Sequence, residues 1–250
     1  MAHPAMTQSS ALKKPVTERA EAGYSLLGKV AEGWNVSRCW IRYSFAGARN
    51  GMPGLVDFVL GNHFFAAMQV AGELTALGEI LATLRPKRAL EIGTYRGGTL
   101  LFLCRLASPR ATIVSVDLPR GRFGGGYSSA RAWFYMRFAR RRQQLQLLQG
   151  DSHSNEMLAR VRAVLGAQEL DYLFIDGDHT YRGVKRDFEL YAPLVRKGGL
   201  IAVHDIAEHP PTAGCEVSRF WNEIKCRYRH LEMIENRQQG WAGIGALYVD

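Results

Sequence analysis

The chain has 250 residues, a formal net charge of +9 and 47% hydrophobic residues, which allows one large packed domain with an N-terminal extension. No apolar run reaches the roughly 18 residues that a membrane span needs, so the sequence argues against a transmembrane protein. Residues 1–10 lack the basic start and the apolar block of a secretory signal, and we therefore expect a cytoplasmic protein.

Four cysteines occur in the chain, at Cys39, Cys104, Cys215 and Cys226. No two of them are separated by two residues, so their spacing gives no zinc-binding or redox motif. In a cytoplasmic protein such thiols are reduced, and we expect most of them to be buried.

The predicted elements begin after a segment with few clear signals. Residues 1–54 are expected to form an N-terminal extension, partly disordered or helical, and its end at Asn50–Gly54 has the composition of a turn or linker. A helical pattern follows over about residues 64–84, where Leu74, Leu77 and Leu81 share one face, and Pro86 ends it.

Strand-like and helix-like segments alternate after Pro86. The predicted strands cover residues 88–92, 111–116, 145–148, 172–175, 200–203, 231–234 and 244–249. The predicted helices between them cover residues 98–106, 128–142, 154–165, 181–194 and 215–225. Repeated β-α units with short apolar strands predict an α/β fold, a doubly wound sheet of about seven mostly parallel strands with helices on both faces.

A glycine-rich motif, Glu91–Thr99, follows the first of these strands and opens the next helix. Its glycines permit a sharp turn and the close approach of a ligand. Asp117 stands at the end of the following strand, 24 residues after Gly93, where an acid can accept hydrogen bonds from ribose hydroxyls. The motif therefore indicates a nucleoside site, and the alternative is a structural glycine turn beside a solvated aspartate.

Two further motifs follow later strands. Gly150–Ser152 comes after the third strand, and the run Phe174–Tyr181 contains Asp176 and His179 at the end of the fourth. The fifth strand ends in His204 and Asp205. Acids and histidines at neighbouring strand ends are typical of metal or proton-transfer chemistry. Simple hydrogen bonding at strand ends, or capping of a helix by His179, is the alternative.

These motifs together resemble those of the class I S-adenosylmethionine-dependent methyltransferases from about Gln69 to the C-terminus. The glycines at 93, 97 and 98 lack the tight G-x-G of a dinucleotide fingerprint. The resemblance implies a Rossmann-like fold, with residues 55–250 as the methyltransferase domain and S-adenosylmethionine as cofactor. The cofactor residues it implies are Glu91, Gly93, Thr94, Tyr95, Gly97, Asp117, Asp151, Ser152 and Asp176.

Within this family, the later motifs resemble the branch of the macrolide-sugar O-methyltransferases and the cephalosporin-biosynthesis methyltransferase. The resemblance implies a Mg²⁺ site at Asp176 and Asp205, and His179 as the catalytic base. His204 stands where the macrolide-sugar enzymes have a second acid, and histidine is a poorer ligand for Mg²⁺. Either two aspartates and water molecules hold Mg²⁺, or His204 joins them around another metal, or no metal is bound.

The expected reaction is methyl transfer to a hydroxyl of a sugar, glycoside or other polar metabolite. A divalent ion lowers the pKa of a bound hydroxyl, and a histidine near neutral pKa can accept its proton. The alternatives are a nicotinamide-dependent oxidoreductase, against which the missing G-x-G speaks, and a non-catalytic binding module. The segment Ile206–Gly214, with His209, is expected to form one wall of the acceptor site.

Basic charge is concentrated between residues 118 and 142, which contain no acid. The seven arginines there are Arg120, Arg122, Arg131, Arg137, Arg140, Arg141 and Arg142. Such a patch suits phosphate, an anionic substrate, nucleic acid, a membrane surface or simply a solvated helix face, and no nucleic-acid-binding signature accompanies it. The aromatic part of the stretch is either a lid over the cofactor or an ordinary covering helix. The sequence leaves open whether the protein forms a homo-oligomer.

Overall fold

The computed structural model describes residues 51–62 and 64–250, so most of the predicted N-terminal extension, with Cys39, lies outside the described residues. Seven strands of the described chain form one sheet in the order β3-β2-β1-β4-β5-β7-β6. The strands are β1 (Arg88–Ile92), β2 (Thr112–Asp117), β3 (Gln144–Gln149), β4 (Leu170–Ile175), β5 (Val195–His204), β6 (Arg229–Met233) and β7 (Ile244–Tyr248). β1 to β5 pair in parallel, and β7 runs antiparallel to both of its neighbours.

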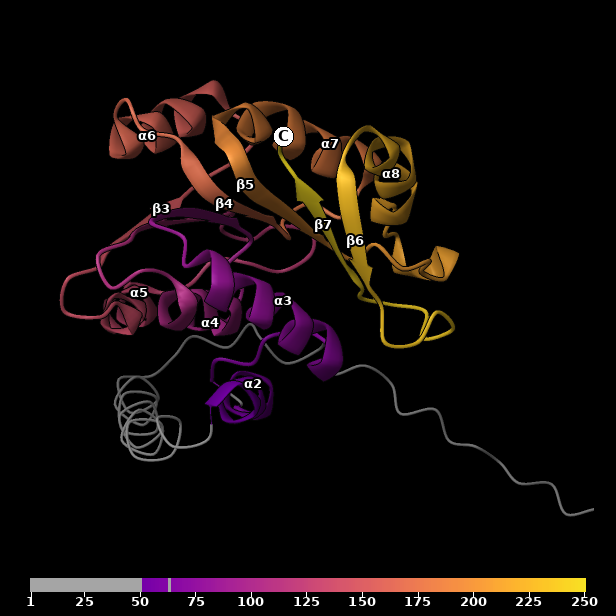
Figure 1. Cartoon of the computed structure of the whole chain (residues 1–250), viewed down its shortest axis with the longest axis horizontal. Helices are drawn as coiled ribbons and strands as arrows, with labels where there is room; N and C mark the ends of the chain where they lie inside the picture. The colour runs from indigo at the N-terminus through magenta and orange to yellow at the C-terminus, as the bar shows by residue number, and fades with distance from the viewer. Residues whose placement is uncertain (1–50, 63) are drawn as a thin grey trace, which may run out of the picture.

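Helices cover both faces of this sheet (Figure 1). On one face lie α3 (Ala71–Leu84), α4 (Gly98–Leu106) and α5 (Ser129–Tyr135), with α2 (Gly51–Gly61) outside them. On the other face lie α6 (Asn155–Leu165), α7 (Tyr181–Tyr191) and α8 (Val217–Ile224). Short 3-10 turns follow several of these elements, at Met136–Phe138, Ala192–Leu194, Pro211–Ala213 and Lys225–Arg227. The predicted doubly wound α/β sheet is confirmed.

The apolar strands form two cores, one on each face of the sheet. Successive side chains of a strand point to opposite faces. Ala89 therefore packs toward the layer of α3 and α4, whereas Leu90 and Ile92 pack toward the layer of α6 and α7. This arrangement explains why the central strands are apolar at nearly every position. Because β1, β2, β4 and β5 are parallel, their carboxyl ends meet at one edge of the sheet, where polar side chains gather.

Serine and threonine side chains fix where several helices begin. The hydroxyl of Ser154 accepts a hydrogen bond from the Met157 N–H at 3.1 Å and caps α6. The hydroxyl of Thr180 accepts one from the Gly183 N–H at 3.0 Å and caps α7. Such caps satisfy N–H groups that the first helical turn leaves unpaired. The cap at Thr180 fixes the direction in which the chain leaves His179.

Two expectations at the start of the described chain are wrong. In the predicted turn at residues 50–54, the described residues 51–54 are the beginning of α2, because proline is tolerated in a first helical turn and Leu55, Val56 and Val59 gain a buried face. The helix predicted from residue 64 begins only at Ala71, after the extended Val70. Residues 66–69, which precede this helix, line the cleft that is described below.

The aromatic stretch after Gly124, Gly125 and Gly126 forms a covering element. The helix predicted over residues 128–142 is α5 followed by a 3-10 turn that ends at Phe138. Phe134, Tyr135 and Phe138 are buried, and the Phe65 ring stacks on Phe134 with a 4.8 Å centroid distance. The stretch is therefore packed on α4 and the Phe65 segment, which favours the covering helix over a lid.

Among the described residues, no helix combines the length and apolar character needed to cross a membrane.

Candidate functional site

A cleft of about 720 Å³ opens at the carboxyl edge of the parallel strands. In sheets of this topology, ligands bind at this edge because the loops diverge there. The loops after β1, β2, β3, β4 and β5 line it, together with residues 66–69 and Trp241. One half contains the glycine motif, and the other contains the aspartates and histidines of the later motifs.

The glycine half is built around a turn that only glycine can make. Gly93 has a φ of +95°, and its N–H donates to the Val116 carbonyl at 2.9 Å. A Cβ at this position would overlap the backbone carbonyl of Asp176. The β1–α4 turn is therefore in contact with the end of β4, and the two halves of the cleft share one wall.

Asp117 connects two loops across this half. One carboxylate oxygen accepts hydrogen bonds from the N–H groups of Thr94 at 3.0 Å and Tyr95 at 3.2 Å. The other accepts one from the Gly126 N–H. Burial raises the pKa of Asp117, and the three N–H donors oppose that rise. Asp117 lies at the cleft wall, and the oxygen that accepts from Gly126 retains a lone pair for a further donor.

The structure brings most of the predicted cofactor residues to the cleft. Seven of the nine line it: Gly93, Thr94, Tyr95, Asp117, Asp151, Ser152 and Asp176. Gly97, with a φ of +84°, is instead the N-cap of α4, where an added Cβ would overlap the Tyr135 ring. Glu91 lies beneath the cleft, 1% exposed, where it accepts a hydrogen bond from Ser115 at 2.9 Å.

Glu91→Gln is expected to remove a pH dependence of stability. Burial raises the pKa of this carboxyl from an ordinary 4.5 to about 8. The bound proton therefore stabilises the fold fully below about pH 4.5, and this stabilisation is lost as the pH rises through about 8, at a cost of up to roughly 5 kcal/mol. Denaturant melts at about pH 6 and about pH 9 should show a larger loss in the wild type than in the variant, because the histidines with raised pKa values titrate in both proteins. An equal loss in the two proteins would contradict the assignment.

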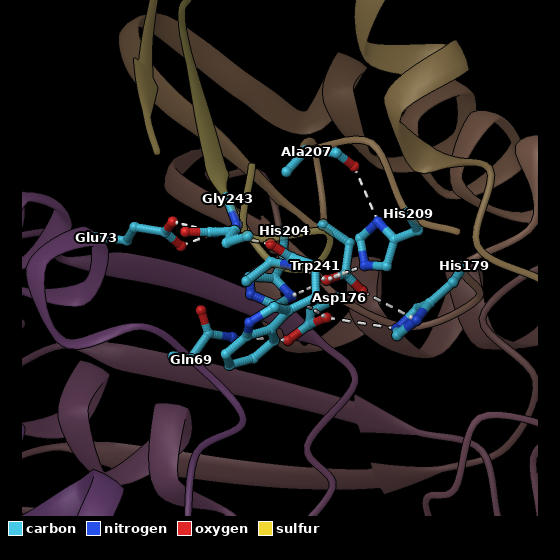
Figure 2. A network of polar contacts seen from close by, with 12 residues as sticks. Gln69, Glu73, Asp176, His179, His204, Ala207, His209, Trp241 and Gly243 are labelled. Atoms are coloured by element: carbon cyan, nitrogen blue, oxygen red, sulfur yellow. Dashed lines mark hydrogen bonds and ion pairs between the residues drawn. The ribbon is translucent and has the colours of Figure 1, made fainter. Parts of the chain in front are cut away.

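The second half of the cleft is a cluster of two aspartates and three histidines (Figure 2). His179 Nδ1 lies 3.1 Å from Asp205 Oδ2, and its Nε2 lies 3.6 Å from Asp176 Oδ1. His204 Nδ1 lies 3.1 Å from Asp176 Oδ1 and 3.3 Å from Asp205 Oδ1. His209 Nε2 lies 3.2 Å from Asp205 Oδ1. The predicted Asp176, His179, His204 and Asp205 thus meet at the ends of β4 and β5.

Charge balance in this cluster depends on the histidines. Burial alone would lower the pKa of His204, but Asp176 and Asp205 raise it well above its usual value. The same opposition raises the pKa of His179, and the hydrogen bond to Asp205 raises that of His209 to about 10. The pKa values of the two aspartates are lowered because these imidazoles outweigh the effect of burial. The two carboxylates therefore attract positive charge strongly.

The cluster also fits a divalent ion. Ligand atoms of Asp176, His204 and Asp205 lie within 4.8 Å of one another. His204 directs Nδ1 at both carboxylates, and its buried Nε2 has no hydrogen-bond partner within the described chain. Two carboxylates suit Mg²⁺, and the added imidazole suits Mn²⁺, Fe²⁺ or Zn²⁺ as well. The donor set matches the predicted metal residues without selecting one metal.

Three residues of the site carry no local signal in the sequence. Gln69, just before α3, donates to Asp176 Oδ2 at 3.2 Å. The Phe123 ring stacks on the His179 ring with a 4.6 Å centroid distance. Trp241, labelled in Figure 2, is 40% exposed and lines the same cleft as Asp176. His209, expected only as part of a wall, contacts Asp205 directly, and no signal in the sequence indicated this contact because the segment between them is not helical.

A glutamate of α3 holds the loop between β6 and β7 in place through hydrogen bonds. The buried Glu73 accepts hydrogen bonds from the Gly243 N–H at 2.8 Å and the Glu235 N–H at 3.1 Å. The neighbouring Ala242 N–H donates to Asp205 Oδ1 at 3.1 Å. Figure 2 shows Glu73 and Gly243 at one end of the network of polar contacts. Glu73 therefore holds the loop that carries Trp241 and supports Asp205.

The seven arginines of the basic stretch do not act as one patch on the cleft. Arg122 alone among them lines it, beside the Phe123 ring, which lies 5.3 Å from its guanidinium. Arg131 and Arg140 donate to backbone carbonyls of Phe64 and Ala107, and Arg137 lies over Trp133. The stretch thus contributes a single cation, Arg122, to the cleft.

Residues 90–206 match a family model described as a methyltransferase domain. An uncharacterized protein of Sinorhizobium fredii, y4gI, is 27% identical over 160 residues, 58% of this chain. A protein of Acanthamoeba polyphaga mimivirus is 50% identical over 40 residues, 16% of this chain. The alignments span only 16% and 18% of the lengths of these two relatives.

Solved structures resemble the whole fold. The O-methyltransferase of Bacillus cereus in complex with S-adenosylhomocysteine has a TM-score of 0.53 at 16% identity, covering 87% of this chain and 99% of that one. TomG of Streptomyces achromogenes, involved in tomaymycin synthesis and in complex with S-adenosylmethionine, has a TM-score of 0.54 at 17% identity, covering 88% and 98%. The chain therefore has the Rossmann-like α/β fold of the class I methyltransferases, and residues 90–206 within it match a methyltransferase domain.

Proposed function

We propose that this protein is an S-adenosylmethionine-dependent O-methyltransferase that acts on a hydroxyl of a sugar, glycoside or other polar metabolite. One observation carries the proposal: the glycine turn with Asp117 and the cluster around His179 face the same cleft. The first half suits a nucleoside, and the second suits removal of a hydroxyl proton. The complexes of the two structural relatives with S-adenosylhomocysteine and S-adenosylmethionine support the choice of cofactor.

In this reaction the acceptor oxygen displaces the cofactor sulfur at the methyl carbon. The new C–O bond forms as the S–C bond breaks, and the acceptor O–H proton must leave. His179 receives it in our proposal: its Nδ1 contacts Asp205 at 3.1 Å, which orients the ring, and its Nε2, 3.6 Å from Asp176 Oδ1, exchanges that carboxylate for the acceptor hydroxyl. The Phe123 ring stacked on His179 limits rotation of the imidazole. Holding the reacting groups in line supplies much of the rate.

Asp176 and Asp205, with His204, are the residues proposed to hold a divalent ion, Mg²⁺ in the first instance. The ion would supply positive charge that lowers the pKa of the acceptor hydroxyl. Chelation with EDTA is expected to lower turnover by at least about tenfold, and Mg²⁺ should restore it. Turnover assays with and without chelator, repeated with Mn²⁺ and Zn²⁺, measure the dependence. Full turnover in chelator would exclude a metal-assisted reaction.

Arg122 favours an acceptor that carries a carboxylate or phosphate. Its guanidinium lies near Gly214 on the His179 side of the cleft, and no described residue forms an ion pair with it. We expect Arg122→Ala to raise the KM for an anionic acceptor by roughly tenfold while kcat changes little, because a charge-assisted hydrogen bond contributes about 1.5–3 kcal/mol. Arg142→Ala, an exposed arginine outside the cleft, is the matched control. An unchanged KM in Arg122→Ala would remove the arginine from acceptor binding.

Calorimetric titration with S-adenosylhomocysteine tests the proposed cofactor, with NAD as the control. We expect binding in the roughly micromolar range for the first and none for the second. Binding of NAD alone would instead support the oxidoreductase. Screening of hydroxylated acceptors with radiolabelled cofactor then tests methyl transfer. Cofactor binding without transfer to any hydroxylated compound would favour the non-catalytic module.

A further inference from the structure

A second group of potential metal ligands shares Asp205 with the aspartate pair. Ligand atoms of His179, Asp205 and Cys215 lie within 4.8 Å of one another. The three residues come from the β4–α7 loop, the end of β5 and the segment before α8. Cys215 is half-buried, so its thiol is shielded and still within reach of solvent ions.

The backbone holds Cys215 in this position. The N–H of Glu216 donates to the His179 carbonyl at 2.8 Å, which joins the cysteine's neighbour to the histidine. A 3-10 turn and Gly214, with a φ of +64°, reverse the chain immediately before the cysteine. The side chain of His209 contacts Asp205 from the same segment. The cysteine is therefore one member of a built cluster with the His179 imidazole and the Asp205 carboxylate.

The donor types of this cluster differ from those of the aspartate pair. Thiolate, imidazole and carboxylate together suit Zn²⁺ and similarly soft ions, whereas Mg²⁺ prefers oxygen. Donor atoms around tetrahedral Zn²⁺ are roughly 3.5 Å apart. Side-chain rotations that move the donor atoms of this cluster by about 1 Å would therefore bring them to that separation. A cation would replace the proton shared between His179 Nδ1 and Asp205 Oδ2, now 3.1 Å apart. The thiol would release its own proton to solvent.

We propose that His179, Asp205 and Cys215 form an inhibitory binding site for Zn²⁺ or a similarly soft divalent ion. An ion there engages the imidazole that the acceptor needs and withdraws Asp205 from the oxygen-rich site. Zinc therefore competes with the activating ion for one shared aspartate. The inhibition rests on the function proposed above, whereas the binding of zinc does not.

Cobalt titration tests the binding site without any acceptor. Co²⁺ takes the place of Zn²⁺ and gives a thiolate-to-metal charge-transfer band only when a cysteine is a ligand. The test uses the full chain carrying Cys39→Ser and Cys226→Ser, which removes the thiol outside the described residues and the exposed one. We expect the band in this background and its loss on adding Cys215→Ser, with zinc affinity reduced roughly 100-fold. An absent band, or one that survives Cys215→Ser, would overturn the proposal.

Inhibition is measured on the same two proteins once an acceptor is known. Zinc is expected to inhibit the background protein, and inhibition of the Cys215→Ser variant should require roughly 100-fold more zinc. Equal inhibition of both proteins would show that zinc acts elsewhere. Melting curves of the two proteins confirm that the substitution leaves the fold intact. Should no acceptor be methylated, the function fails while the cobalt titration still decides whether the ion binds.

Discussion

Gly93→Ala is expected to abolish S-adenosylhomocysteine binding and to lower the free energy of unfolding by about 3 kcal/mol or more. Gly93 has a φ of +95°, and an added Cβ would overlap the carbonyl of Asp176 and approach Gly177 N to 3.1 Å. Relief of this overlap must separate the β1–α4 turn from the end of β4. Calorimetry measures the loss of binding, and denaturant melts measure the loss of stability.

Gly166→Ala is the matched control for this prediction. Gly166 also has a positive φ, +62°, but nothing lies within 4 Å of the position that its Cβ would take. This variant therefore includes the backbone strain without the overlap, and it should lose about 1–3 kcal/mol of stability and keep its affinity for the cofactor product. If Gly93→Ala behaved like this control, the contact between the two halves of the cleft would not matter for binding.

His179→Ala is expected to reduce kcat by at least about 100-fold, the usual contribution of a positioned general base. Affinity for S-adenosylhomocysteine should be unchanged, because the cofactor half of the cleft depends on the turn at Gly93 and on Asp117. Single-turnover assays with a methyl acceptor measure the rate of methyl transfer, and calorimetry measures the affinity for S-adenosylhomocysteine.

His230→Ala supplies the comparison for the histidine substitution. His230 is exposed on β6, outside the cleft, so its removal should leave both quantities unchanged. Unchanged turnover in His179→Ala would remove this histidine from the role of base. A parallel loss of cofactor affinity would instead indicate that its contacts with Asp176 and Asp205 hold the cleft together.

The sequence predicted some elements to the residue because strong local signals bound them. The strand at Arg88–Ile92 lies between Pro86 and the glycine motif, and the helix that starts at Gly98 follows a glycine with positive φ. The turn expected at residues 50–54 failed because Pro53 and its glycines are also compatible with a first helical turn. Burial of the next residues, which is tertiary information, decided between the two.

The residues of the candidate site likewise fall into those that the sequence predicts and those that only tertiary packing brings to the cleft. Asp176 and Asp205 end adjacent parallel strands, so their proximity follows from the topology that the β-α pattern predicts. Trp241 and Gln69 reach the cleft through the β6–β7 loop and the segment before α3. No spacing or periodicity in the sequence links either residue to the strand ends, because packing between distant segments places them there.

Glu73 and Gly243 are hydrogen-bonded although 170 residues separate them in the chain. Contacts of such long range form late in folding, because closing a long loop costs entropy before packing compensates it. The β1–α4–β2 unit, with its glycine turn and Asp117, is local by comparison. We therefore expect hydrogen exchange during refolding to protect the nucleoside half first, and a nascent chain to complete its acceptor wall only after its last strand has paired.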